Sequence, residues 1–226
     1  MNPNNISDIF FDLDHTLWDF DKNSAVAFET IFAKHKINLG LPLFLETYNP
    51  INQRYWSLYQ RNEVDKEELR FKRLQDTFSA CDFSVSGEII EKLSEDYIVH
   101  LPESNHLFPG VVDTLNYLHK KYTLHIITNG FQEVQQQKLS NSKIEHYFKT
   151  LTTSEEAGAK KPDPRIFGFA LEKAKCHKDT SLMIGDNLEA DVQGALDFGM
   201  QAIHFSETCD HNGCVIAKHQ SLFELL

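Results

Sequence analysis

The chain has 226 residues, of which 41% are hydrophobic and 24% are charged, and its formal net charge is −11. A chain of this length is expected to form one or two domains with a buried core. Because so acidic a surface repels other polyanions, we do not expect a nucleic-acid polymer as a partner. No stretch approaches the roughly 18 consecutive apolar residues that a membrane span needs, so we expect no membrane insertion.

The start of the chain and its cysteines bear on its location. Residues 1–5 lack the basic beginning and the apolar centre of a signal peptide. The four cysteines show no spacing typical of a disulfide framework, which favours free thiols in a reducing cytoplasm. Histidines and cysteines gather near the C-terminus, but their spacing fits no standard zinc site, so we do not expect zinc there. This group contains His204, Cys209, His211, Cys214 and His219.

The first expected element is a short apolar strand at residues 9–11, which ends in the acids Asp12 and Asp14. An apolar run of this kind is typical of a strand that is buried on both faces. In open α/β sheets, ligands bind at the carboxyl ends of the strands. Asp-x-Asp is also common in turns, so the pair taken alone favours a turn.

Helical periodicity follows from about residue 24 to residue 101, with no strand between its segments. Four apolar stripes predict four helices. Asp65, with Glu68 three residues later, is typical of a capping box at the start of one helix. Asn49 and Pro50 predict a helix start or a kink in another. We therefore expect an inserted helical domain.

Strands and helices alternate after this insertion. Strands are expected at residues 123–127, 150–153, 181–184 and 201–205, and helices near 111–118, 132–139, 164–171 and 188–198. Asp163 and Pro164 suit the start of the third helix, and Gly199 suits the end of the fourth. A short element and a final helix are expected at the C-terminus. The alternation predicts an α/β fold with a parallel, doubly wound, Rossmann-like sheet.

Four expected strands each deliver a polar group at or just beyond the carboxyl end. These groups are Asp12 and Asp14, Thr128 and Asn129, Lys160 or Lys161, and Asp186. In a parallel sheet, all of these ends lie on one edge. Carboxylates that lie so close together have raised pKa values unless a cation neutralises them, and Mg²⁺ suits such oxygen ligands. The sequence therefore predicts a magnesium site in one cleft.

The ordered motifs resemble those of the haloacid dehalogenase-like hydrolase superfamily. They are DLDHTL at residues 12–17, TNG at 128–130, KPDP at 161–164 and GDNLEAD at 185–191. The helical insertion after the first motif matches the position of the family's type-1 cap. The resemblance implies a Rossmann-like catalytic core over residues 1–17 and 104–226, and a helical cap over residues 18–103.

The resemblance also implies a Mg²⁺-dependent phosphomonoester hydrolase. Asp12 would be the nucleophile that forms an aspartyl-phosphate, and Asp14 would be the general acid and base. Asp12, the backbone carbonyl of Asp14 and Asp186 would bind the metal. Thr128 and the amide of Asn129 would bind the phosphoryl oxygens.

Two further residues have open roles. Lys161 would stabilise the charge that develops on the transferred group, and Asp191 would orient Lys161 or support the metal. Simpler readings exist for each position. Thr128 also suits a strand end, and adjacent lysines are commonly solvated, but the matched pattern with proline directly afterwards favours Lys161 over Lys160. Asp191 also suits a surface or capping position.

The expected substrate is a small phosphorylated metabolite. Residues 17–21 and the helical insertion resemble the branch of noncanonical pyrimidine-nucleotide 5′-nucleotidases, while related branches act on sugar phosphates or phosphoglycolate. A phosphoryl mutase also carries both acids. Asp14 argues against a 2-haloacid dehalogenase, and the complete set of motifs argues against a non-catalytic binding protein. Four aromatic residues suit stacking on a base, although packing between cap and core is favoured for each. They are Trp18, Phe20, Tyr55 and Trp56.

Overall fold

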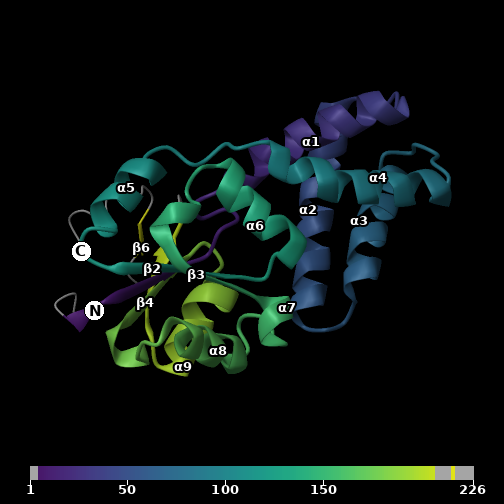
Figure 1. The fold of residues 1–226 in the computed structure, drawn as a ribbon. Coiled ribbons are helices and arrows are strands. Elements are labelled where there is room, and N and C mark those ends of the chain that lie inside the picture. The colour runs from purple at the N-terminus through teal and green to yellow at the C-terminus, as the bar shows by residue number, and fades with distance from the viewer. Residues whose placement is uncertain (1–4, 207–214, 217–226) are drawn as a thin grey trace. The chain divides into compact units, whose positions relative to one another are not determined.

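A computed structural model describes residues 5–206 and 215–216 of the chain. Its centre is a parallel sheet in the order β3-β2-β1-β4-β5-β6 (Figure 1). The strands are β1 Asp8–Phe11, β2 Thr123–Thr128, β3 Phe148–Thr153, β4 Ser181–Gly185, β5 Gln201–Phe205 and β6 Val215–Ile216. The prediction of a doubly wound α/β fold is therefore confirmed. The expected final helix lies outside the described residues, as do Cys209, His211, Cys214 and His219 of the C-terminal group.

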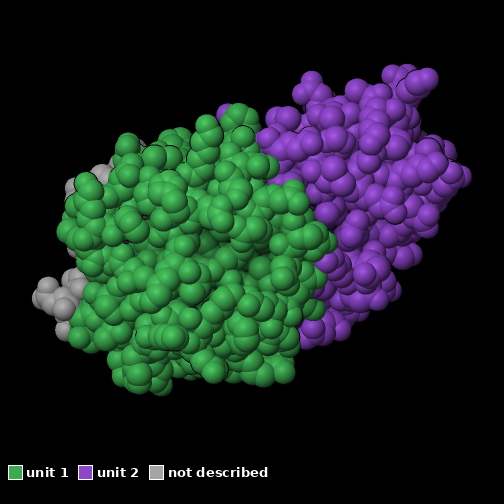
Figure 2. All heavy atoms as spheres, in the orientation of Figure 1, with its two compact units in different colours: residues 1–20, 105–226 green, residues 21–104 purple. Residues whose placement is uncertain are grey.

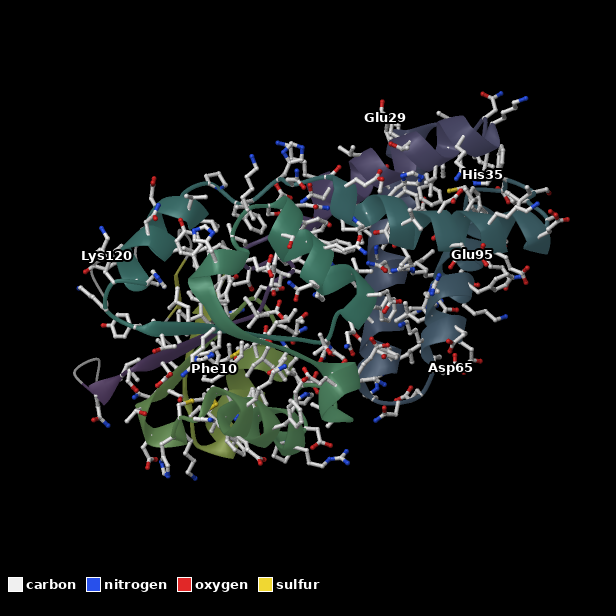
Figure 3. The ribbon with its side chains drawn as sticks, viewed as in Figure 1. Phe10, Glu29, His35, Asp65, Glu95 and Lys120 are labelled. Atoms are coloured by element: carbon white, nitrogen blue, oxygen red, sulfur yellow. The ribbon has the colours of Figure 1, made fainter. Side chains whose placement is uncertain are left out.

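Helices lie on both faces of the sheet. Figure 1 shows α5 and α6 on one side and α8 and α9 on the other. Their bounds are α5 Val111–Leu118, α6 Gln132–Asn141, α7 Ser154–Ala157, α8 Pro164–Ala174 and α9 Gly194–Phe198. Phe10, labelled in Figure 3, is fully buried in the core between β1 and the helices α8 and α9. Two-sided burial explains why β1 is apolar at consecutive positions rather than alternate ones.

The single helix expected at residues 188–198 is instead a π-helical segment, Leu188–Gln193, followed directly by α9. The Asn187 side chain accepts hydrogen bonds from the amides of Glu189 and Ala190. The carbonyl of Asn187 accepts from the amides of both Asp191 and Val192, which gives the wider turn. As expected, the helical segment ends at Gly199, which has φ 95°.

The helical insertion contains α1 Phe20–His35, α2 Leu41–Gln60, α3 Lys66–Ala80 and α4 Gly87–His100. The expected capping box is present: Asp65 accepts from the Glu68 amide at 2.8 Å, and Glu68 accepts from the Asp65 amide at 3.3 Å. Asp65 is labelled at the start of α3 in Figure 3. Of the two alternatives at Asn49 and Pro50, the helix start is wrong, because α2 begins at Leu41 and continues through Pro50, and the kink stays a prediction. Its first turn already contains a proline, Pro42, which suits a helix start.

Contacts within the chain divide it into two compact units, coloured separately in Figure 2. Unit 1 contains residues 1–20 and 105–226, and unit 2 contains residues 21–104. The core of unit 2 is aromatic: the ring centroid of Phe28 lies 4.8 Å from that of Phe44 and 4.7 Å from that of Tyr97. Among the described helices, none has the combination of length and apolar character that crossing a membrane requires.

Candidate active site

The carboxyl edge of the sheet in unit 1 brings the predicted site residues together. β1 pairs in parallel with β2 on one side and β4 on the other, so Phe11 lies opposite both Ile126 and Ile184. Asp12 follows β1, Thr128 ends β2 and Asp186 follows β4. The register therefore aligns the ends of three strands at one edge, where their next side chains meet.

Lys161 is the cation at the centre of this edge. Its side chain is 2% exposed, and its Nζ lies 2.5 Å from Asp12 Oδ1 and 2.6 Å from Asp191 Oδ1. Nζ also donates to the carbonyl of Ile127 at 2.8 Å. Burial alone would lower the pKa of Lys161, but the two carboxylates outweigh burial and hold the pKa above its ordinary value. The ammonium group is therefore charged at neutral pH.

Asn129 determines where Lys161 lies. The Asn129 side chain accepts a hydrogen bond from the Lys161 amide at 2.8 Å and donates one to the Lys161 carbonyl at 3.0 Å. These two bonds join the end of β2 to the backbone of the loop between α7 and α8. They hold the backbone of Lys161 at the edge where Asp12 and Asp191 lie.

Three carboxylates lie close together beside this ammonium group, and two of them contact it. Ligand atoms of Asp12, Asp186 and Asp191 all lie within 4.8 Å of one another. Burial raises the pKa of Asp186 to about 7, with a further contribution from the charge of Asp191. Burial also raises the pKa of Asp12 well above its ordinary value, although Lys161 opposes the shift. The cluster is short of positive charge, and its hard oxygen donors fit a divalent cation such as Mg²⁺.

Neighbouring residues fix the two acids that follow β4. The hydroxyl of Thr16 donates to Asp186 Oδ1 at 3.1 Å and accepts from the Asp186 amide at 3.0 Å. Asp191 Oδ2 accepts from the amide of Asn187 at 3.0 Å. A Cβ atom at Gly185 would lie 2.2 Å from Asp191 Oδ2, so only glycine leaves room for this carboxylate. Thr16 lies within the first motif, but no local pattern distinguishes its hydroxyl from that of an ordinary turn residue.

Asp14 lies in a second polar cluster, which the sequence analysis missed. Its two carboxylate oxygens contact side chains of α6: Lys138 Nζ lies 2.6 Å from Oδ1, and Gln135 Nε2 lies 3.0 Å from Oδ2. Gln135 Nε2 also donates to Thr128 Oγ1 at 2.7 Å. This amide therefore links Asp14 to the end of β2. Gln135 and Lys138 share the buried face of α6 with Val134 and Leu139.

Trp18 does not present a free ring for stacking on a base. It is fully buried, and Lys138 Nζ lies 4.3 Å from the centroid of its ring. Phe20 is 7% exposed and lies 5.5 Å from the same ammonium group. Both rings therefore serve packing around Lys138 in unit 1.

Comparisons with known proteins show which family the chain resembles. Residues 9–205 match the sequence profile of the haloacid dehalogenase-like hydrolases. The chain is 32% identical to pyrimidine 5′-nucleotidase YjjG of Escherichia coli (strain K12) over 193 residues, which are 85% of this chain and 82% of that protein. It is 29% identical to glyceraldehyde 3-phosphate phosphatase of Methanothermobacter thermautotrophicus over 205 residues, covering 86% of this chain and 83% of that one.

A solved structure shares the whole fold. The crystal structure of the HAD hydrolase YfnB from Bacillus subtilis, bound to magnesium, aligns with a TM-score of 0.88 at 25% identity. The alignment covers 97% of this chain and 98% of that one.

Proposed function

Because the chain belongs to the haloacid dehalogenase-like hydrolases, we propose that it is a Mg²⁺-dependent phosphomonoester hydrolase with an aspartyl-phosphate intermediate. The observation that carries the proposal is the contact of Lys161 with Asp12, at 2.5 Å, beside the carboxylate of Asp186. Two carboxylates and an ammonium group thus lie together at one strand edge, which supports the roles of nucleophile for Asp12, metal ligand for Asp186 and charge stabiliser for Lys161. The presence of Asp14 as a second acid supports phosphoryl transfer over dehalogenation.

The reaction divides into two steps. In the first, an oxygen of Asp12 bonds to phosphorus while the bond from phosphorus to the leaving oxygen breaks, and Asp14 gives that oxygen a proton. In the second, water bonds to phosphorus, Asp14 takes the proton of that water, and the bond to Asp12 breaks. Inorganic phosphate then leaves, and both acids return to their starting forms. The Thr128 hydroxyl and the Asn129 amide would bind the phosphoryl oxygens, while Lys161 stabilises their charge.

The carboxylates of Asp12 and Asp186 and the backbone carbonyl of Asp14 would hold the metal. Bound Mg²⁺ would neutralise these acids and the phosphoryl group that approaches them. For Asp191 we favour a supporting role, because one of its oxygens contacts Lys161 and the other accepts the Asn187 amide. Asp191 would therefore orient Lys161 rather than bind the metal.

For the substrate, we propose a pyrimidine nucleoside 5′-monophosphate, and residues 18–103 as the cap that selects it. The similarity to a pyrimidine 5′-nucleotidase supports this choice. The similarity to a glyceraldehyde 3-phosphate phosphatase, at 29% identity, favours sugar phosphates as the second candidate. Cys81 and Cys176 are free thiols, which supports a cytoplasmic location.

Phosphate release from the purified full chain tests the proposal. The substrates are pyrimidine and purine nucleoside monophosphates, glyceraldehyde 3-phosphate, phosphoglycolate and hexose phosphates, each with Mg²⁺ and with a chelator. We expect hydrolysis only with Mg²⁺, fastest for pyrimidine nucleotides, and none from Asp12→Asn. Full activity of Asp12→Asn would exclude Asp12 as the nucleophile. Faster turnover of a sugar phosphate than of any nucleotide would exclude the nucleotidase assignment.

A further inference from the structure

Two polar side chains of α6 contact the two oxygens of the Asp14 carboxylate, one each. Lys138 contacts Oδ1 at 2.6 Å and Gln135 contacts Oδ2 at 3.0 Å. The two residues lie three apart on the helix and so project from the same face. Lys138 is 2% exposed and Gln135 is fully buried. An ammonium and an amide nitrogen can only donate, so both oxygens of Asp14 are held as acceptors.

The surroundings of Lys138 fix its ammonium group in one place. Its Nζ lies 4.3 Å from the ring centroid of Trp18 and 5.5 Å from that of Phe20. The two rings pack edge to face, with their centroids 6.2 Å apart. A cation over an aromatic face is stabilised by the ring, and burial of a lysine is costly unless its charge is paired. An apolar side chain would fill this position without that cost, so packing alone does not explain a lysine here.

Gln135 connects Asp14 to the end of β2. Its Nε2 donates to Thr128 Oγ1 at 2.7 Å, and the Gly130 amide donates to the same oxygen at 3.0 Å. A hydroxyl oxygen has two acceptor lone pairs and one proton to donate. Because both lone pairs of Thr128 are used, its proton remains to be donated to another acceptor, such as a phosphoryl oxygen. Gln135 thus orients Thr128 and Asp14 together.

We propose that Lys138 and Gln135 are positioning residues that hold Asp14 to take the proton of the attacking water. This inference rests on the proposed phosphatase function. Neither side chain has a chemical step of its own: both act through Asp14, and Gln135 also acts through Thr128. Their loss leaves Asp12 and Lys161 untouched, so phosphorylation of Asp12 continues with a leaving group that needs no proton. Hydrolysis of the aspartyl-phosphate is then the impaired step.

The test uses p-nitrophenyl phosphate, because nitrophenolate leaves without protonation. Lys138→Met keeps the length of the side chain and removes its charge, Gln135→Leu removes both donated bonds, and Lys138→Arg restores a cation. Gln136→Met, on the exposed side of α6, is the matched control. Rapid mixing measures the burst of nitrophenolate, and acid quenching of labelled enzyme measures the aspartyl-phosphate. Thermal unfolding shows whether each variant is folded.

For Lys138→Met and Gln135→Leu we expect a burst near one nitrophenolate per enzyme, followed by turnover slowed by about tenfold to a hundredfold. The aspartyl-phosphate should accumulate, Lys138→Arg should recover part of the rate, and Gln136→Met should behave as the wild type. In an Asp14→Ala background, Lys138→Met should add no further loss. Folded variants with wild-type turnover, or with slow turnover and no aspartyl-phosphate, would overturn the inference. A wild type that neither hydrolyses the substrate nor forms the phosphoenzyme would instead overturn the proposed function.

Discussion

Gly130 and Gln135 fit together because Gly130 has no side chain. A Cβ atom at residue 130 would lie 2.1 Å from Nε2 of Gln135 and 2.5 Å from its Cδ. Contacts this short force the Gln135 side chain to move, and with it the amide that joins Asp14 to Thr128. The glycine of the second motif therefore has a physical role, which is to leave room for a residue of α6.

We predict that Gly130→Ala reproduces the kinetic defect of Gln135→Leu without any change to Asp14, Thr128 or Gln135 themselves. The expected loss of turnover is about tenfold or more, because the displaced amide no longer fixes the carboxylate. Steady-state kinetics with a nucleoside monophosphate and with p-nitrophenyl phosphate measure it.

Gly168→Ala is the matched control for Gly130→Ala. A Cβ atom at Gly168 would meet Phe198 at 3.8 Å, an ordinary contact, and the residue lies inside α8. This control should keep wild-type kinetics and gain about 0.5–1 kcal/mol in the free energy of unfolding, since alanine favours a helix over glycine. If Gly130→Ala also keeps wild-type kinetics, Gln135 has no positioning role.

The different surroundings of Asp186 and Asp191 give a second prediction. Both acids belong to the carboxylate cluster, but Asp191 is occupied by Lys161 and by the amide of Asn187. We expect Asp186→Asn to lose the increase in melting temperature that Mg²⁺ gives the wild type, because a ligand that binds only the folded state stabilises it. Asp191→Asn should keep that increase and lose activity through a misplaced Lys161.

Thermal unfolding with 0 and excess Mg²⁺ measures this difference without any assay of activity. Ca²⁺, a larger cation with oxygen ligands, provides a comparison of selectivity. Loss of the Mg²⁺ effect in Asp191→Asn, with retention in Asp186→Asn, would reverse the assignment of metal ligand and supporting residue.

A buried histidine predicts how stability depends on pH. His125 Nε2 lies 3.1 Å from Asp8 Oδ1, Nδ1 lies 2.8 Å from Thr150 Oγ1, and the ring stacks on Phe10. Burial lowers the pKa of His125 below its usual 6.5, although Asp8 opposes the shift; the Lys149 ammonium group also contributes to the lowering. As pH falls through 6.5, the unfolded chain therefore binds a proton that the folded protein does not.

The free energy of unfolding should accordingly decrease as pH falls from about 6.5 toward the lower pKa that His125 has in the folded protein. Above pH 6.5 this contribution to stability is fully present. His125→Gln should reduce the slope of the free energy of unfolding against pH by up to the contribution of one bound proton, whatever its effect on absolute stability. Urea unfolding between pH 5 and pH 8 measures the slope. His177→Gln is the control, since the His177 side chain is 76% exposed. An unchanged slope in His125→Gln would contradict the prediction.

Much of the architecture could be predicted because it depends on local patterns. Apolar runs that end in polar residues identified β1, β2 and β4, and the alternation with helices predicted that their ends share an edge. The capping box at Asp65 and the glycine at residue 199 are also local signals. By contrast, the path of α2 through Pro50 depends on the packing of unit 2, which outweighs one proline in a long helix.

The cluster around Asp14 could not be predicted in the same way. Gln135 and Lys138 lie 121 and 124 residues from Asp14 in the sequence, so no local pattern pairs them. Their helix is rich in glutamine, and polar residues at its buried positions obscure the apolar stripe that would mark a buried face. Only the fold shows that these polar side chains point at an acid.

Unit 2 contains a buried cation without a carboxylate partner among the described residues. Arg73 is 2% exposed, and its Nη1 donates to Asn52 Oδ1 at 2.9 Å. The guanidinium carbon lies 5.0 Å from the ring centroid of Tyr97 and 5.9 Å from that of Tyr48. Within the described part of the chain, the Arg73 Nε atom has no hydrogen-bond partner. The charge therefore depends on one amide oxygen and two rings.

Replacing Asn52 and replacing Arg73 should have opposite effects on the free energy of unfolding. Asn52→Leu leaves the guanidinium without its acceptor and should lower the free energy of unfolding by about 2–3 kcal/mol. Arg73→Met fills similar space without charge and should be neutral or stabilising, since buried ion sites are commonly no better than apolar packing. The double variant should recover most of the loss from Asn52→Leu, because no buried charge then remains unpaired. Urea unfolding of the four proteins measures the cycle, and a loss above about 3 kcal/mol in Arg73→Met would show that the cation itself stabilises unit 2.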